Sequence, residues 1–162
     1  MPRFPLLATV DLGSNSFRLQ ICAVEEGQLR IVDSIKEMVR FAAGLDENKN
    51  ITLDAQQRAL KCLSRFGQRL AGFKPEQVRV VATNTFRVAR NIASFLPQAE
   101  EALGFPVEII AGREEARLIY LGVKHTQPPT NDNMLVVDIG GGSTEFVIGN
   151  ALQPDIMESL PL

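Results

Sequence analysis

The sequence predicts an α/β fold: a mixed five-stranded sheet flanked by helices, followed by the first strands of a second, similar lobe. Two observations support this fold class. From Leu6 to Lys124, stretches with the two-residue period of strands alternate with stretches of helical period. In addition, the motif at Asp11–Ser16 recurs with the same spacing at Asp138–Ser143.

The N-terminal part of the sequence predicts three consecutive strands. Leu6–Asp11 is expected to form the first strand. Ser16–Glu25 and Gln28–Lys36 are expected to pair as a hairpin around Glu26 and Gly27.

A loop and a helix are expected next. Residues 40–50 are polar and contain glycine, which is typical of a loop. Thr52 is expected to cap a helix that ends near Gly72. Its apolar positions have helical spacing and should pack on the sheet: Ala59, Leu63, Phe66 and Leu70.

Further along the chain, predicted strands and helices alternate. Strands separated by helices pair in parallel, whereas the opening hairpin is antiparallel, so the sheet should be mixed. Pro97 is expected in a first turn or at a kink, and a break is expected near Asn91. The predicted elements are a strand at Val78–Ala82, a helical region from Thr83 to Leu103, a strand at Val107–Ala111 and a helix at Arg113–Lys124.

Residues 126–131 are rich in helix breakers and predict a lobe boundary. We expect a first lobe over residues 1–126 and the start of a truncated second lobe over residues 127–162, with about three strands and no packing helix. Such a partial lobe leaves an apolar face and strand edges uncovered. Dimerisation or strand exchange could cover them, and a homodimer is expected.

The stretch from Leu135 to Phe146 is the most informative one. An apolar run leads into an acid, three glycines and two hydroxyl residues, which predicts a strand, a tight loop and a returning strand. Glycines let backbone N–H groups surround an anion, and Asp138 is an oxygen ligand suited to Mg²⁺. A glycine-rich β-turn with an incidental acid is the alternative. The candidate phosphate-binding residues are Gly140, Gly141, Gly142, Ser143 and Thr144.

An internal repeat favours the phosphate-binding interpretation. Val10–Ser16 matches Val137–Ser143 at an offset of 127 residues (137 minus 10), with Asp, Gly and Ser in register. Two such units facing each other could hold a phosphate chain from both sides. Neither loop has the GxxxxGK[ST] or GxGxxG pattern of other nucleotide-binding proteins. The candidates in the first loop are Gly13, Ser14, Asn15 and Ser16.

Composition excludes several classes of function. A net charge of -2 gives no electrostatic reason to expect nucleic-acid or anionic-membrane binding. Phe4–Val10 is too short to span a bilayer, so a cytoplasmic protein without membrane insertion is expected. Cys22 and Cys62 have no metal-ligand spacing, and His125, the single histidine, cannot build a zinc triad.

Glu115 is the candidate catalytic base. On the predicted helix it shares a face with Leu118, Ile119 and Gly122, which places a carboxylate on the packed side. Burial there would raise its pKa, so that it could accept a proton from water near neutral pH. The alternative is a first-turn acid favoured by the helix dipole, which accounts well for Glu114.

Arginine side chains offer further phosphate contacts. Arg87 follows the end of a predicted strand and could bind phosphate through two hydrogen bonds, although a solvated helix-surface arginine is the alternative. Arg18 lies on the opening hairpin, and the pattern leaves open which way it faces.

Asp11–Leu19 and Val137–Glu145 resemble the two phosphate loops of the exopolyphosphatase / guanosine pentaphosphate phosphohydrolase (Ppx/GppA) family. This family belongs to the actin-like, sugar-kinase and Hsp70-type ATPase superfamily. The paired loops alone identify the superfamily, whereas Gly112–Val123 resembles the phosphatase family specifically. The resemblance extends from Ala8 to the end of the chain and implies an actin-like ATPase (ribonuclease H-like) lobe.

The resemblance also implies a function. It implies a hydrolase that releases terminal orthophosphate from inorganic polyphosphate by metal-assisted in-line attack of water, with Glu115 as the general base. It implies Mg²⁺ held by Asp138 and Glu145, with Asp11 as a further contributor, and leaves open a role for K⁺. The alternatives are hydrolysis of guanosine pentaphosphate, a kinase of the same superfamily, or a non-enzymatic nucleotide-binding module.

Overall fold

The computed structural model describes residues 5–128, 132–150 and 154–162. The chain forms two compact units, Met1–Ile109 and Ile110–Leu162, here called unit 1 and unit 2. The predicted boundary segment extends into residues 129–131, which lie outside the described residues. Within the described ranges, no helix is long and apolar enough to cross a membrane.

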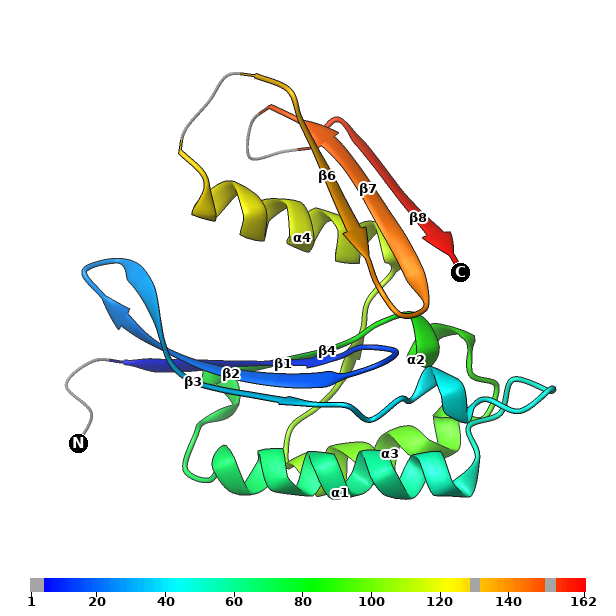
Figure 1. The fold of residues 1–162 in the computed structure, drawn as a ribbon. Helices are drawn as coiled ribbons and strands as arrows, with labels where there is room; N and C mark the ends of the chain where they lie inside the picture. The colour runs from blue at the N-terminus through cyan, green and yellow to red at the C-terminus, as the bar shows by residue number, and fades with distance from the viewer. Residues whose placement is uncertain (1–4, 129–131, 151–153) are drawn as a thin grey trace. The chain divides into compact units, whose positions relative to one another are not determined.

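Unit 1 contains the predicted mixed sheet (Figure 1). Its five strands lie in the order β3-β2-β1-β4-β5. β1 pairs antiparallel with β2 and parallel with β4, as the hairpin and the later helices predict. Glu26 and Gly27 have φ of 50° and 79°, the left-handed values of a tight hairpin turn. The strands are β1 (Leu6–Leu12), β2 (Phe17–Glu25), β3 (Gln28–Glu37), β4 (Val78–Ala82) and β5 (Glu108–Ile109).

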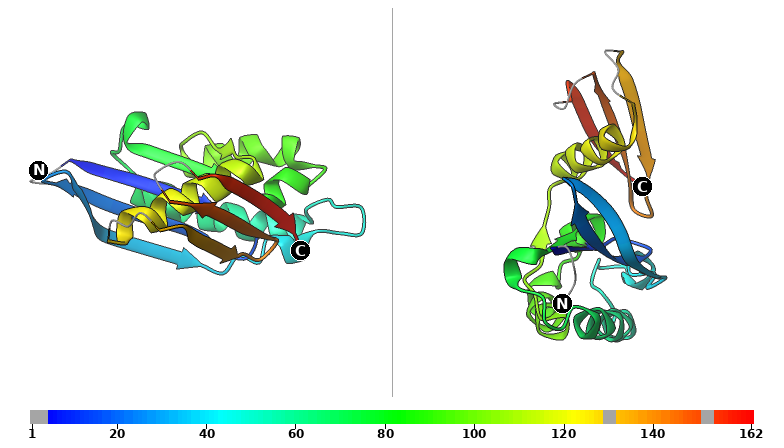
Figure 2. Two further views of the ribbon diagram at one scale, coloured as in Figure 1. Left: turned by 90° about the horizontal axis from the view of Figure 1, so that it is seen from above. Right: turned by 90° about the vertical axis from the view of Figure 1, so that its left-hand side faces the viewer.

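Two helices, α1 (Leu53–Arg69) and α3 (Ile92–Leu103), cover one face of this sheet (Figures 1 and 2). The Thr52 hydroxyl caps α1 by accepting a hydrogen bond from the Ala55 N–H. The helix ends earlier than predicted, because Leu70 is its C-cap and Gly72 (φ 90°) lies beyond it. Pro97 lies inside α3 rather than in its first turn. Two 3₁₀ turns, Ala42–Gly44 and Pro75–Gln77, complete the unit.

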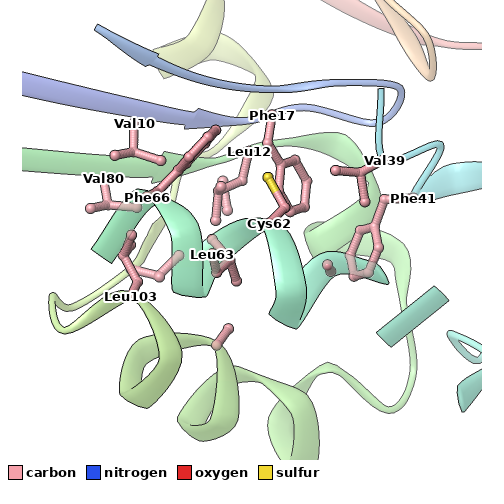
Figure 3. Packing of buried hydrophobic residues seen from close by; sticks show 14 of the residues in the cluster. Val10, Leu12, Phe17, Val39, Phe41, Cys62, Leu63, Phe66, Val80 and Leu103 are labelled. Atoms are coloured by element: carbon pink, nitrogen blue, oxygen red, sulfur yellow. The ribbon is translucent and has the colours of Figure 1, made fainter. Parts of the chain in front are cut away.

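The core of unit 1 fixes the segments around the first glycine loop. Val10, Leu12 and Phe17 pack against α1 residues such as Leu63 (Figure 3). Phe17 also contacts the ring of Phe41, with a centroid separation of 5.7 Å. The aromatic rings of Phe41, Phe86 and Phe95 are in mutual contact. Phe86 lies on the helix α2 (Asn84–Val88), so this cluster joins α2 to the core.

Unit 2 is a three-stranded antiparallel sheet, ordered β6-β7-β8, with one helix. The helix α4 (Gly112–Thr126) packs on this sheet through Ala116 and Tyr120. The expectation that these strands lack a packing helix is therefore wrong, because the helix that precedes the predicted boundary covers them. Because α4 packs on these strands, it belongs to unit 2, and the two compact units divide before it, after Ile109. The strands are β6 (Met134–Ile139), β7 (Ser143–Gly149) and β8 (Ile156–Pro161).

Candidate functional site

The first glycine loop, residues 13–16, joins β1 to β2 in a closed turn. The Gly13 N–H donates a 3.2 Å hydrogen bond to the Ser16 carbonyl. The carbonyls of Ser14 and Asn15 accept hydrogen bonds from the N–H groups of Ala42 and Arg40, at 2.8 and 2.7 Å. Within the described residues, the N–H groups at positions 14–16 donate no backbone hydrogen bond. The loop thus has donors to offer an anion.

A hydroxyl contact ties this loop to the helix that carries Arg87. Thr85 Oγ1 and Ser14 Oγ lie 2.7 Å apart in a hydrogen bond between two buried side chains. Arg87 follows two residues later on α2 and is half-buried. The Thr83 N–H donates to the Leu12 carbonyl at 3.3 Å, which anchors the start of this segment to the end of β1. The structure therefore connects two of the predicted phosphate contacts within unit 1.

The second glycine loop, residues 140–142, has the same closure. The Gly140 N–H donates a 2.9 Å hydrogen bond to the Ser143 carbonyl, as Gly13 does to Ser16. Both turns need glycine, because an added Cβ would lie 3.0 Å from the Ser16 oxygen in the first loop and 2.9 Å from the Ser143 oxygen in the second. Ser143 and Thr144 are buried at the start of β7. The predicted internal repeat is thus present in the backbone.

A row of polar side chains crosses the unit 2 sheet next to this loop. Asp138 of β6 lies directly opposite Glu145 of β7, which lies opposite Ser159 of β8. Glu145 is only 1 % exposed, and the Ser159 hydroxyl donates a 2.8 Å hydrogen bond to its Oε1. Partial burial raises the pKa of Asp138, and the negative charge of Glu145 raises it further.

This carboxylate pair fits Mg²⁺ as a partial ligand set. Two facing carboxylates repel each other, and a cation between them would remove the repulsion. Within the described residues, no group of three or more His, Cys, Asp or Glu side chains could hold a metal ion. Mg²⁺ is usually bound by one or two carboxylates, and water and substrate phosphate supply the remaining oxygens.

Glu115 lies at the same end of unit 2 as the second glycine loop. Helix α4 runs antiparallel to β6, so its first turn lies where β6 leads into residues 140–142 (Figures 1 and 2). Gly149 pairs with the first residue of β6, and a Cβ added to it would meet the hydroxyl of Tyr120, in the second half of α4. The later part of α4 therefore lies near the start of β6. The site therefore includes Glu115, in the first turn of α4.

The predicted surroundings of Glu115 need a correction. Ile119 packs against the core of unit 2, but Leu118 is 36 % exposed and Gly122 is exposed, so this face is not the packed one. The buried stripe of α4 is one residue further along, at Ala116 and Tyr120. Glu115 is half-buried. The full burial on which the sequence argument for a raised pKa rested is absent, and the base role stays a prediction.

Two residues of the site were not among the predicted ones. Thr85 braces Ser14, and Ser159 holds the Glu145 carboxylate. Alternating polarity in residues 156–160 indicates a strand, but nothing in the sequence gives its register against β7. Thr85 likewise lies in a predicted helix start, and its loop contact depends on tertiary packing.

Comparison with known proteins decides the family. Residues 20–162 match the model of the Ppx/GppA phosphatase family. The chain belongs to this family. Among solved structures, it is similar to the PPX-GPPA enzyme of Aquifex aeolicus, with 32% identity and a TM-score of 0.84 over 98% of this chain and 53% of that one. It is also similar to an exopolyphosphatase from Cytophaga hutchinsonii, with 29% identity and a TM-score of 0.90 over 98% and 51% of the two chains.

The Ppx/GppA chain thus spans about half the length of these solved relatives. A more distant likeness, to an inorganic polyphosphate/ATP-glucomannokinase from Arthrobacter, has 16% identity and a TM-score of 0.51 over 93% and 61% of the two chains, and shows the fold alone. Together these comparisons confirm the actin-like ATPase fold.

The predicted site residues fall into two groups, one in each unit. Unit 1 brings together the loop at 13–16 and the helix with Arg87, and Asp11 lies at the end of β1. Unit 2 brings together Asp138, Glu145 and the loop at 140–142, with Glu115 at the same end. That both groups bind one substrate stays a prediction.

Proposed function

We propose that this Ppx/GppA protein hydrolyses phosphoanhydride bonds and releases terminal orthophosphate from inorganic polyphosphate. The observation that carries the proposal is the duplicated loop: Gly13 and Gly140 close their turns with the same hydrogen bond, each two residues after an aspartate. One anion-binding turn is common in proteins, but two copies in one chain suit a substrate that presents several phosphates.

The chain's own residues supply the chemistry as follows. Water attacks the terminal phosphorus in line, and Glu115 accepts the proton that the water loses. Charge on the equatorial oxygens is met by the N–H groups of both loops and by the Arg87 guanidinium. The bridging oxygen leaves with the shortened chain. Because most of the catalysis is positioning, the rigid closure of both turns matters more than the strength of any single donor.

Mg²⁺ would be held by Asp138 and Glu145, and Asp11 would contribute from unit 1. When bound, the ion would neutralise negative charge on the phosphate oxygens. Ser159 positions the Glu145 carboxylate for this role by its hydrogen bond. K⁺ as an additional ion is also part of the proposal, and activity with and without K⁺ tests it.

The experiment is a comparison of orthophosphate release from three substrates by the complete protein with Mg²⁺. Release from inorganic polyphosphate supports the proposal. Release only from guanosine pentaphosphate indicates that the protein is a guanosine pentaphosphate phosphohydrolase instead. Release only from ATP, or tight binding without turnover, indicates a kinase-like or non-enzymatic role and overturns it. The 162-residue chain alone should be nearly inactive, because it spans about half of its solved relatives.

A further inference from the structure

A buried hydrogen bond joins two hydroxyl side chains beside the first glycine loop. Thr85 Oγ1 donates to Ser14 Oγ at 2.7 Å, and the two residues are 1 % and 6 % exposed. They lie 71 residues apart in the sequence, so the packing of α2 against the loop is what brings them together. We call this contact the hydroxyl bridge.

The Thr85 side of the bridge is held firmly. The next residue, Phe86, contacts the rings of Phe17 and Phe41, with centroid separations of 6.2 and 5.0 Å. The Thr85 carbonyl accepts a hydrogen bond from the Ala89 N–H at 3.1 Å, which closes the single turn of α2. A β-branched side chain has few rotamers in a helix. The Thr85 hydroxyl therefore has little freedom to leave the bridge.

The Ser14 side of the bridge keeps one donor unused. The Ser14 carbonyl is fixed by the Ala42 N–H at 2.8 Å. Within the described part of the chain, the Ser14 hydroxyl makes no hydrogen bond other than the one it accepts from Thr85. A hydroxyl has one proton to donate and can also accept. Because Thr85 is the donor in the bridge, the proton of Ser14 remains available to another acceptor.

This direction of the bridge suits a phosphate ligand. The oxygens of ionised polyphosphate accept hydrogen bonds and have no proton to give, so a serine hydroxyl that binds them must donate. Its other hydrogen bond must then be one that it accepts, which is what Thr85 provides. In a chain of this kind each hydrogen bond polarises the next, and a donor that is already oriented needs no reorganisation when the phosphate arrives.

The second glycine loop lacks this feature. Adding the repeat offset of 127 to Ser14 gives Gly141, which has no hydroxyl. The turn closures at Gly13 and Gly140 are the same, so the difference between the loops lies in the side chain at the next position. The first loop thus adds an oriented side-chain donor to the backbone donors that both loops share.

We propose that Thr85 is a positioning residue, which holds the Ser14 hydroxyl with its proton directed at a phosphate of the substrate. This inference rests on the proposed function, because it takes the loop at 13–16 as a phosphate site. Thr85 itself touches no substrate atom and acts through Ser14. Its contribution to catalysis is therefore conditional on the Ser14 hydroxyl.

Steady-state kinetics of the complete protein on long-chain polyphosphate test the role of Thr85. Thr85→Val keeps the shape of the side chain and removes its donor, so it should lower kcat/KM about 5- to 20-fold. Thr85→Ser restores a hydroxyl at the same position and should stay within about 2-fold of wild type. Ser14→Ala removes the hydrogen bond to the charged phosphate itself and should lower kcat/KM about 10- to 100-fold.

A double-mutant cycle separates positioning from a merely structural role. In the Ser14→Ala background, Thr85→Val should lower kcat/KM less than about 2-fold further, because the hydroxyl through which Thr85 acts is already absent. Losses that multiply in the double variant would show that Thr85 supports α2 and Arg87 instead, and would overturn the proposal. Wild-type kcat/KM in Thr85→Val would overturn it as well.

A matched variant controls for stability. Thr52→Val also removes a threonine hydroxyl, the one that caps α1, and should lower the melting temperature while leaving kcat/KM within about 2-fold of wild type. If Thr85→Val unfolds, Thr85→Ala replaces it in the cycle. A loss of kcat/KM in Thr52→Val as large as that in Thr85→Val would mean that lowered stability explains both, and would overturn the positioning role.

A binding measurement keeps this inference distinct from the proposed function. If the wild-type protein binds tripolyphosphate but releases no orthophosphate, the proposed function fails, and calorimetric titration with tripolyphosphate repeats the cycle without turnover. A Kd that Thr85→Val raises in the wild-type background, but not in the Ser14→Ala background, supports the hydroxyl bridge. Equal Kd values for wild type and Thr85→Val, or no binding by the wild type, overturn it.

Discussion

The two copies of the strand-turn-strand motif have the same backbone but opposite surroundings. In unit 1, helices cover the face that contains Ala8, Val10 and Leu12, which are at most 2 % exposed. Adding the offset of 127 gives Leu135, Val137 and Ile139, which are 60, 44 and 77 % exposed. In unit 2, helix α4 covers the other face of the sheet instead.

This difference separates what is local from what is tertiary. The turn closure and the strand pairing depend on glycine spacing and alternation, which both copies share. Which face of the sheet is covered depends on the helices that pack on it, and these differ between the two units. This difference changes the surroundings of the polar side chains that cross each sheet. In unit 2, Val136 is buried under α4, and the neighbouring acids Asp138 and Glu145 form a partly desolvated pair. In unit 1, Arg18 stands at the position equivalent to Glu145 and is exposed.

The largest effect is expected from the first turn of α4. Glu115→Gln removes the proposed proton acceptor and keeps the shape of the side chain. We expect kcat of the complete protein to fall about 10²- to 10⁴-fold, with substrate binding nearly intact. Single-turnover orthophosphate release, together with a binding titration, measures both quantities.

Glu114→Gln is the matched control for this experiment. Glu114 forms a two-point ion pair with Arg117, at 2.8 and 2.7 Å, and this pairing raises the pKa of Arg117. Loss of a surface pair of this kind changes little, so the rate should stay within a few-fold of wild type. An equal loss of rate in both variants would show that the helix start, rather than one carboxylate, supports catalysis.

A second test compares equivalent core positions of the two copies. Leu12→Ala removes a fully buried side chain and should lower the free energy of unfolding by about 2–5 kcal/mol. Ile139→Ala, at the repeat-equivalent position, removes a side chain that is 77 % exposed and should change it by less than about 0.5 kcal/mol. Denaturant unfolding of the 162-residue chain measures both values. A large cost for Ile139→Ala would mean that this face is covered in solution.

The elements that the sequence predicts well are those with strong local signals. The hairpin turn at Glu26 and Gly27, the Thr52 cap and the repeat of the glycine loops all depend on residue types at fixed spacing. The strand Val78–Ala82 also has its predicted bounds, with the predicted helical region starting directly after it.

The predictions that failed concern which surface packs where. For α4, helical spacing alone allows two neighbouring stripes, one with Glu115 and Leu118 and one with Ala116 and Tyr120, and only the sheet beneath it selects the second. The sheet on which α4 packs also could not be predicted. The helix lies in the sequence between the strands of unit 1 and those of unit 2, and it could pack on either sheet. Ser159 was missed since strand register is a property of the assembled sheet.

The smallest expected effect is a pH-dependent one that compares the two aspartates of the repeat. The pKa of Asp138 is raised by partial burial and by Glu145, so without metal the folded protein binds the Asp138 proton more tightly than the unfolded chain does. As pH rises above the pKa of the unfolded chain, ionisation of Asp138 therefore costs stability. Asp138→Asn removes that cost and should stabilise the metal-free protein near neutral pH.

The Asp138 residue is exposed to solvent, and solvent screens its charge. The gain in stability from Asp138→Asn should therefore be less than about 1 kcal/mol. The gain should vanish in acid, below the ordinary pKa of an aspartate, where Asp138 is protonated in both states. Thermal unfolding of the metal-free 162-residue chain at neutral and acid pH measures it. The same scans with Mg²⁺ should reverse the order near neutral pH, since the ion would stabilise only the chain that keeps the carboxylate pair. A variant that gains stability equally at both pH values would exclude carboxylate repulsion as the cause, and with it the argument that Asp138 and Glu145 form a pair suited to a cation.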